Sequence, residues 1–337
     1  MVLVRWAELI ESHADEIALL ETLDVGKPIT DTLNIDVSAT VRTIRWSGEA
    51  IDKVYDEISP TPSDCLALVT RVPLGVVTAI VPWNFPLSTT AWKLAPSLAT
   101  GNSVILKPAT NTPLSALRVA ELATEAGLPE GVLQVLPGSG SSLGKHLALH
   151  MDVDGLTFTG STLVGKRLME YSGQSNLKRT YLELGGKSPN IVFADCNLEK
   201  ATSSAALAVF YNGGQTCTAG TRLIVEESIM DKFLLKLVDH AKAWMPDNPL
   251  DPATTMGPMI DEAQFQMVCD YVAIGKEEGA TLLLGGSTVH EQTGGFYHEP
   301  TIFTDVNNQM RIAQDERFCP VLSVLQWKDD EQSVAIA

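Results

Sequence analysis

Between residues 75 and 183, short apolar runs alternate with amphipathic stretches of helical period. The apolar runs, each predicted to be a buried strand, cover residues 76–81, 103–107, 132–136, 155–159 and 180–183, and a run at 190–193 closes the series. Helices are predicted between them at about 87–99, 113–126, 142–149 and 161–171. Strands that alternate with helices form β-α-β units, in which successive strands lie parallel. The sequence therefore predicts an α/β fold built on a doubly wound parallel sheet.

The regular alternation loosens after Asp195, which indicates a second domain. Helices are predicted there at about 198–211, 228–244 and 262–278, with a strand at 222–225 and mixed strand and turn over 281–305. We place the boundary at about residue 185, so that residues 1–53 and 74–184 form the first domain and residues 185–337 the second. The helical patterns at Met1 and at 331–337 begin and end in mid-pattern, and we expect the chain to continue beyond both.

Residues 54–73 differ from both domains. Two short strands, at 54–58 and 66–71, flank a stretch rich in proline, serine and threonine at 59–64, which predicts a β-hairpin. Its exposed edges make it a candidate for pairing with another subunit, and an ordinary surface hairpin is the alternative.

Composition excludes several functional classes. The net charge of −17 argues against nucleic acid or an anionic membrane as a partner, because both bind a basic face. The five cysteines are an odd number without C-x-x-C spacing, and the six histidines are scattered, so we predict a reducing compartment and no metal site. The first 20 residues carry four acidic side chains, and no apolar run is long enough to span a membrane, so we expect a cytoplasmic protein.

Three predicted strands are followed directly by polar residues or glycine, in the segments 81–86, 106–108 and 158–161. In doubly wound sheets, ligands bind outside the carboxyl ends of the strands. Three such ends on one sheet favour a binding edge over three ordinary turns.

The segment that starts at Gly160 leads straight from a strand into a helix, whose first N–H groups can hold a phosphate. It also resembles the phosphate loop of nucleotide hydrolases, but Arg167 stands where that loop has a hydroxyl for magnesium. The hydrolase interpretation is therefore weak, whereas the interpretation that this helix end binds a pyrophosphate is not excluded. The G-x-G-x-x-G fingerprint is absent, so the glycines alone leave the ligand undecided.

Two side chains suggest acid–base and nucleophilic chemistry. Cys217 lies in a run of small and polar residues, which leaves room for a substrate, although a lone cysteine more often serves packing. Glu183 lies between Leu182 and Leu184, and we expect partial desolvation to raise its pKa toward that of a general base.

At this point the motifs together resemble the aldehyde dehydrogenase superfamily. Residues 182–188 (Leu-Glu-Leu-Gly-Gly-Lys-Ser) are similar to its glutamate signature and residues 214–217 (Gly-Gln-Thr-Cys) to its cysteine signature, at the family's spacing. Residues 82–86, 107–108 and 158–161 match three further family motifs in family order. The resemblance implies a Rossmann-like cofactor domain, a catalytic domain over 185–337 and a hairpin that pairs subunits into a dimer or tetramer. It implies NAD or NADP as cofactor and a small aldehyde as substrate.

The resemblance also implies a role for each matching residue. Cys217 would be the nucleophile, Asn84 would help to hold the oxyanion, Glu183 would activate water to hydrolyse the thioester, and Lys93 matches a lysine near the catalytic centre. The residues that would contact the cofactor are Val81, Pro82, Trp83, Lys107, Ala109, Thr110, Gly160, Ser161, Gly165, Leu184, Glu316 and Phe318. Those that would line the substrate tunnel are Phe85, Thr89, Trp92, Thr216 and Thr218.

Residues 46–55 and 191–196 look most like the branch that oxidises γ-glutamyl-γ-aminobutyraldehyde and related aminoaldehydes of polyamine catabolism. Thr110 replaces the family glutamate that binds the 2′- and 3′-hydroxyls of NAD, so we expect NADP to be accepted at least comparably. Cys319 replaces a family glycine, and we expect it to crowd its loop or to disfavour the loop's backbone angles. The rival hypothesis is a catalytically inactive fragment that acts only as a binding or assembly partner.

Overall fold

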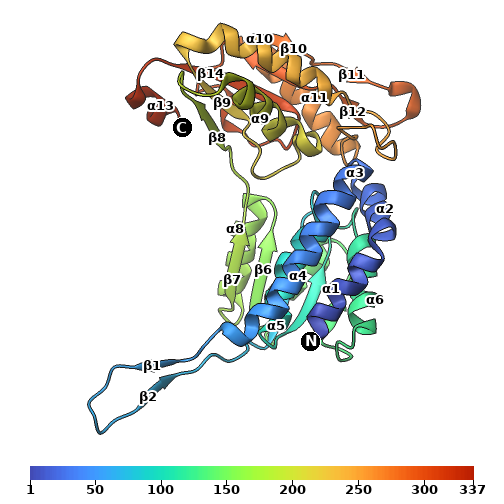
Figure 1. Ribbon diagram of the computed structural model, residues 1–337, viewed down its shortest axis with the longest axis vertical. Helices are drawn as coiled ribbons and strands as arrows, with labels where there is room; N and C mark the ends of the chain where they lie inside the picture. The colour runs from blue at the N-terminus through green and yellow to red at the C-terminus, as the bar shows by residue number, and fades with distance from the viewer. The chain divides into compact units, whose positions relative to one another are not determined.

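The computed structural model describes all residues from 1 to 337, which divide into two compact units (Figure 1). The first unit comprises Met1–Asp24 and Thr30–Leu184, and the second comprises Val25–Ile29 and Gly185–Ala337. The short segment Val25–Ile29, which the sequence placed in the first domain, therefore belongs to the second unit.

The first unit contains the predicted parallel sheet. Its strands follow the order β5 (Leu133–Val135), β4 (Ser103–Lys107), β3 (Val76–Ile80), β6 (Gly155–Thr159) and β7 (Arg179–Glu183), and every neighbouring pair is parallel. The connecting helices are α5 (Pro86–Ala99), α6 (Leu114–Glu125), α7 (Lys145–Leu149) and α8 (Thr162–Gln174). Helix α5 packs on α6 and α7 on α8. The chain moves outward from β3 to β5 and then returns to β6, so right-handed crossovers place the two pairs on opposite faces.

Helical segments at the start of the chain precede the sheet, and two of them cover the pair α5 and α6. They are α1 (Val2–Ser12), α2 (Ala14–Val25), the short α3 (Ile29–Asp31), a π-helical turn (Thr32–Val37) and α4 (Ser38–Ala50). Helix α1 packs against α4 and α6, and α4 packs against α5. The buried face of α1 includes Trp6, whose indole N–H donates to the Val119 carbonyl of α6 at 2.7 Å.

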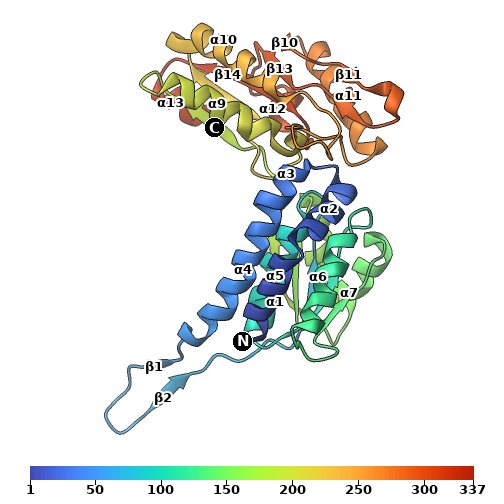
Figure 2. The same cartoon turned by 45° about the vertical axis from the view of Figure 1, so that its right-hand side comes forward.

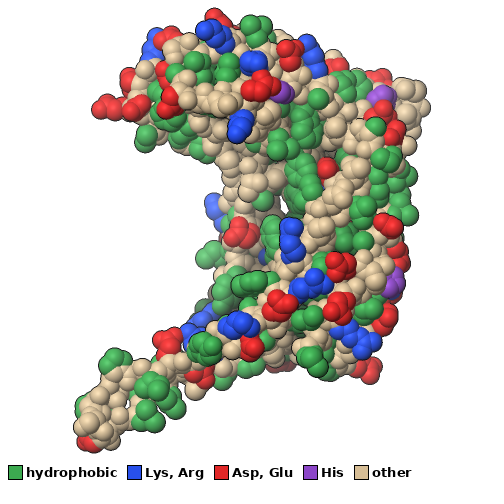
Figure 3. Space-filling view, in the orientation of Figure 1, with side chains coloured by type: hydrophobic (Ala, Val, Ile, Leu, Met, Phe, Trp, Pro, Cys, Tyr) green, Lys and Arg blue, Asp and Glu red, His purple; other side chains and the backbone are tan.

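A hairpin extends from the first unit after the turn Ile51–Lys53 (Figures 1 and 2). Its antiparallel strands β1 (Glu57–Ser59) and β2 (Ala67–Val69) are shorter than predicted. Hydrophobic side chains lie open on it (Figure 3), including Ile58 at 73% and Leu66 at 72% exposure. An isolated two-stranded hairpin has no core of its own, which explains why so little of it is regular strand.

The second unit has its own five-stranded sheet. The strand order is β10 (Thr281–Leu284), β13 (Thr301–Thr304), β14 (Val321–Trp327), β9 (Arg222–Glu226) and β8 (Pro189–Val192), with only β10 antiparallel to its neighbour. The run at 190–193 therefore does not close the first sheet, as the sequence had suggested. Too few residues separate β7 from β8 for the crossover that a parallel neighbour in the same sheet requires.

Both faces of this second sheet are buried. Leu223 and Val225 of β9 pack in a core with Phe233, whereas Ile224 between them packs in a second core with Tyr271. This alternation follows from the two-residue period of a strand. The covering helices are α9 (Leu198–Phe210) and α10 (Met230–Ala241) on one face, and α11 (Glu262–Glu277) and α12 (Arg311–Gln314) on the other. The remaining elements are β11 (Thr288–Val289), β12 (Tyr297–His298) and α13 (Asp330–Ile336).

No helix of the structure combines the length and the apolar character needed to cross a membrane. No cluster of three or more histidine, cysteine or acidic side chains has a geometry that could hold a metal ion.

Candidate active site

The predicted ligand-binding motifs of the first unit meet at one edge of its sheet. Ile80 at the end of β3 pairs with Lys107 at the end of β4 and with Phe158 of β6, and Thr159 pairs with Glu183 at the end of β7. This register brings the segments that follow β3, β4 and β6 to the same edge as Glu183. The predicted residues gathered there are Val81, Pro82, Trp83, Asn84, Lys107, Ala109, Thr110, Gly160, Ser161, Glu183 and Leu184.

Lys107 is buried at this edge, and its Nζ donates to the carbonyls of Pro108 at 2.6 Å and Gly138 at 2.9 Å. Burial lowers the pKa of Lys107 below its ordinary value, because the charged amine loses solvation. The Thr110 hydroxyl donates to the same Gly138 carbonyl at 3.3 Å. Both predicted ribose-contacting side chains are therefore held against the loop that follows β5.

The first turn of α8 forms the next part of the edge. Ser161 caps the helix by accepting from the Val164 N–H, and the Gly160 N–H donates to the Glu183 carbonyl at 3.1 Å. A β-carbon on Gly160 would lie 2.5 Å from the Phe158 ring, and one on Gly165 would lie 2.5 Å from Leu184. Both glycines are therefore required for the close packing of this helix start on β6 and β7, with its leading residues exposed.

Glu183 is exposed, which contradicts the expectation that it is partly desolvated. Neighbouring side chains of a strand point to opposite faces. Leu182 and Leu184 accordingly pack against the core around Phe158 and Leu168, and they leave Glu183 uncovered.

Helix α5 carries Lys93 and two predicted tunnel residues, and a third, Phe85, is its N-cap. Lys93 is buried at 8% exposure, and its Nζ donates to the Thr157 hydroxyl at 3.1 Å. Burial lowers the pKa of Lys93 to about 8, and the negative charge of Glu183 opposes part of this shift. Thr89 is buried and its hydroxyl donates to the Phe85 carbonyl at 2.6 Å, whereas Trp92 is 56% exposed.

Cys217 lies in the second unit, on the loop between α9 and β9, and it is exposed. Three consecutive residues before it, Asn212, Gly213 and Gly214, have left-handed φ angles of 53°, 62° and 71°. The buried Gln215 side chain fastens this turn, because its Nε2 donates to the Asn212 carbonyl at 3.0 Å and its Oε1 accepts from the Ile260 N–H at 3.1 Å. The glycine-rich run that precedes the cysteine therefore builds a fixed backbone that presents an accessible thiol.

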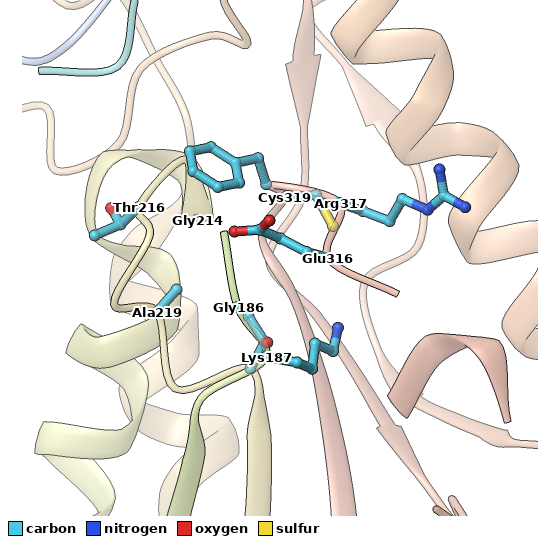
Figure 4. Close-up of a pocket in the computed structure, with 10 residues that line it drawn as sticks. Gly186, Lys187, Gly214, Thr216, Ala219, Glu316, Arg317 and Cys319 are labelled. Carbon is cyan, nitrogen blue, oxygen red and sulfur yellow. The ribbon is translucent and has the colours of Figure 1, made fainter. Parts of the chain in front are cut away.

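A small pocket of the second unit brings Thr216, Glu316 and Phe318 together (Figure 4). The Glu316 carboxylate points toward Gly214 and Thr216, and its Oε1 and the Thr216 hydroxyl are both buried without a partner. Burial raises the pKa of Glu316, and the Gly186 N–H and the charge of Lys187 oppose that rise. Thr218, the last predicted tunnel residue, is exposed on the neighbouring loop.

Cys319 lines the same pocket, and its backbone does not have the strain that we expected. The residue with a left-handed backbone is Phe318, at φ 51°, whereas Cys319 has no positive φ. The Cys319 side chain is 3% exposed and packs in the core with Ile224 and Tyr271, which raises the pKa of its thiol to about 11 through desolvation.

Three functional candidates were not found from the sequence. Lys187 donates from Nζ to the Tyr271 hydroxyl at 2.8 Å, and burial lowers the pKa of Lys187 to about 8. Gln264 donates to two backbone carbonyls of the loop that carries Glu316. Lys187 belongs to the glutamate motif, which could have drawn attention to it, but Tyr271 and Gln264 lie in an ordinary amphipathic helix and carry no signal.

Two features of the structure fit a dinucleotide. The exposed start of α8 presents backbone N–H groups of the kind that bind a pyrophosphate. The pocket offers Glu316 Oε1 and the Thr216 hydroxyl, two buried polar atoms that lack partners and could bond a ribose or a carboxamide. Both features are of the kind that a nicotinamide dinucleotide requires.

The aldehyde dehydrogenase family matches the chain over residues 1–337. The chain belongs to this family. It is 52% identical over 337 residues to the NADP/NAD-dependent aldehyde dehydrogenase PuuC of Escherichia coli, covering 100% of this chain and 67% of that protein. The chain spans about two thirds of the length of its curated relatives, for example 66% of an aldehyde dehydrogenase from Leishmania tarentolae.

Solved structures agree with the fold. An indole-3-acetaldehyde dehydrogenase in complex with NAD+ matches with a TM-score of 0.99 and 57% identity, covering 100% of this chain and 68% of that one. A γ-glutamyl-γ-aminobutyraldehyde dehydrogenase from Burkholderia cenocepacia matches with a TM-score of 0.98 and 53% identity over the same shares. The predicted family, fold class and enzyme class are thereby confirmed, and the names of these relatives agree with the predicted NAD(P) cofactor class.

Proposed function

We propose that the protein oxidises an aldehyde to a carboxylic acid, with NAD+ or NADP+ as the electron acceptor and Cys217 as the nucleophile. The observation that carries this proposal is the exposed Cys217 thiol on a loop whose backbone is fixed by three left-handed residues and by the buried Gln215. A cysteine kept for packing would be buried, as Cys319 is.

In the proposed reaction the Cys217 thiolate adds to the aldehyde carbon and forms a thiohemiacetal. The Asn84 side chain and the Cys217 backbone N–H hold the developing oxyanion. The nicotinamide cofactor, when bound, supplies the hydride acceptor. The thiohemiacetal is oxidised to a thioester on Cys217, and Glu183 takes a proton from the water that hydrolyses it. The overall balance is aldehyde, water and NAD(P)+ to carboxylic acid, NAD(P)H and a proton.

Several side chains and one helix start would hold the cofactor. Lys107 and Thr110 would bond the adenosine ribose, and the start of α8 at Gly160 and Ser161 would take the pyrophosphate. Glu316 would accept from the nicotinamide ribose, while Val81, Trp83, Gly165, Leu184 and Phe318 would shape the walls. Because Thr110 places no carboxylate at the 2′-position, we propose that NADP+ is used at least comparably to NAD+.

We propose an aminoaldehyde, such as γ-glutamyl-γ-aminobutyraldehyde, as the substrate. The similarity to PuuC and to the Burkholderia cenocepacia enzyme supports this choice. The N-cap Phe85 and the α5 residues Thr89 and Trp92 are four and three residues apart, and they would wall the tunnel together with Thr216 and Thr218. Lys93 would adjust the charge near Glu183.

We further propose that the hairpin at 54–73 pairs subunits. Its exposed apolar side chains, among them Ile58, Leu66 and Val72, support a role in assembly, because such a patch is costly in water. Light scattering of the wild type and of an Ile58→Glu variant tests this: a smaller assembly in the variant is expected, and an unchanged mass contradicts it.

Steady-state NADPH formation with a panel of aldehydes tests the catalytic proposal. Cys217→Ala should abolish turnover, whereas Cys65→Ala, which removes another exposed cysteine on the hairpin, should leave turnover unchanged. Glu183→Gln should still give a first burst of NADPH but should stall at thioester hydrolysis. A burst from Cys217→Ala would refute the assignment. A folded wild type without turnover would instead favour the rival hypothesis of a binding or assembly partner.

A further inference from the structure

One side chain of helix α11 fastens the loop that carries Glu316. Gln264 is buried at 9% exposure, and its Nε2 donates to the Arg317 and Phe318 carbonyls, both at 2.7 Å. The Gln264 N–H is itself bonded to the Asp261 side chain at 2.9 Å, which caps α11. The two donors therefore start from a rigid helix end.

The backbone that these donors hold is strained. Phe318 has a left-handed φ of 51°, which is costly for a residue with a bulky side chain. Such a conformation persists only where the surroundings impose it. Gln264 bonds the carbonyls on both sides of the Phe318 Cα, and so it acts on the strained residue itself. Two turns further along α11, the Tyr271 hydroxyl donates to the Ile312 carbonyl at 2.6 Å, which anchors the other end of the loop.

The segment that leads into α11 also contacts the loop of Cys217. The Ile260 N–H donates to Gln215, and a β-carbon on Gly213 would lie 2.7 Å from the methyl group of Met259. The two loops touch each other as well, because a β-carbon on Gly214 would meet the Cys319 carbonyl oxygen. The glycines before Cys217 thus pack against the loop of Glu316.

We propose that Gln264 is a positioning residue that sets the placement of the Cys217 thiol. By fixing the Arg317 and Phe318 carbonyls it holds the peptide that enters Cys319. The next peptide, Cys319–Pro320, in turn bounds Gly214. The catalytic consequence depends on the proposed aldehyde oxidation, whereas the placement of the thiol does not. Small displacements of a reacting group cost large factors in rate.

The test compares Gln264→Glu and Gln264→Met with the same changes at Gln266. Glutamate keeps the size of the side chain but lacks the N–H donors, and methionine keeps the length without polarity. Gln266 is exposed on the same helix and donates to the surface residue Asp270 at 2.8 Å, so its variants are the matched control. The rate of Cys217 alkylation by iodoacetamide is followed by mass spectrometry of the Cys217 peptide, alongside Tm, kcat and KM.

In both Gln264 variants, iodoacetamide should alkylate Cys217 at least threefold more slowly than in wild type, and kcat should fall at least tenfold. In the Gln266 variants, the alkylation rate and kcat should stay within twofold of wild type. Equal alkylation rates in Gln264 and Gln266 variants would overturn the proposal. So would loss of folding in both Gln264 variants, because the side chain would then serve stability alone. Alkylation needs no turnover, so an inactive wild type with altered alkylation in the variants would contradict the proposed function and leave the positioning role standing.

Discussion

Replacing Gly214 by alanine should directly distort the backbone of the loop that carries Cys217. The glycine has a φ of +71°, and a β-carbon there would lie 2.1 Å from the Cys319 carbonyl oxygen. The left-handed backbone costs an L-residue about 1–2 kcal/mol. The clash adds about 1–3 kcal/mol, because its partner is backbone and cannot swing aside. The sum is about 2–5 kcal/mol of lost stability in the second unit.

Gly279 in the same unit separates these two contributions. It has a φ of +89°, but nothing lies within 4 Å of a β-carbon built on it. Gly279→Ala should therefore show the backbone cost without the clash, and Gly214→Ala should be destabilised by a further ~1–3 kcal/mol.

Differential scanning calorimetry measures this difference. A loss of 1 kcal/mol in the free energy of unfolding lowers Tm by about 2–4 °C for a unit of 150–250 residues. The second unit should therefore melt about 2–12 °C lower in Gly214→Ala than in Gly279→Ala. Gly214→Ala should also change the rate of Cys217 alkylation, and Gly279→Ala should not. Equal melting shifts with equal alkylation would refute the argument that the Cys319 backbone bounds the cysteine loop.

The remaining predictions concern the first unit. Burial lowers the pKa of Lys93 from 10.5 to about 8, so between these values the unfolded chain binds more protons than the folded one. The free energy of unfolding of wild type should therefore rise relative to that of Lys93→Met by about 3 kcal/mol between pH 8 and about 10.5. Urea titrations of the two proteins at each pH measure this difference, and a difference that does not change with pH would contradict the buried amine. Thr110→Glu should lower kcat/KM for NADP+ at least tenfold relative to NAD+, because its carboxylate opposes a 2′-phosphate. Thr110→Gln, the neutral control, should leave the ratio of the two cofactors near that of wild type.

Much of the fold was predictable, because local periodicity reports burial directly. The apolar runs that became β3, β4 and β6 have the strand positions expected from them, and the polar residues after them share one edge because parallel strands end together. The run at 190–193 was misplaced for a different reason. Its composition is that of a buried strand, and composition does not say which of two sheets buries it.

Some properties of the candidate site were likewise predictable from the sequence, and others were not. The small residues around Cys217 predicted an accessible sulfur, and the structure shows in addition three consecutive left-handed residues before it. The exposure of Glu183 could not be predicted from its leucine neighbours, since adjacent residues of a strand face opposite sides. The contacts of Gln264 could not be predicted from the sequence either, because its hydrogen bonds go to backbone carbonyls that lie far away in sequence.

By itself, the sequence determined the family and the parallel sheet, and it predicted Cys217 as the reactive thiol. These properties lie in short motifs and in periodic patterns, each of which acts through covalent neighbours. Only the tertiary structure decided that Glu183 is open to solvent and that Cys319 lies in a core. It also decided that α11 and the segment leading into it contact the loops of Glu316 and Cys217. Those properties depend on burial and on contacts between distant residues, and they exist only once the chain has folded.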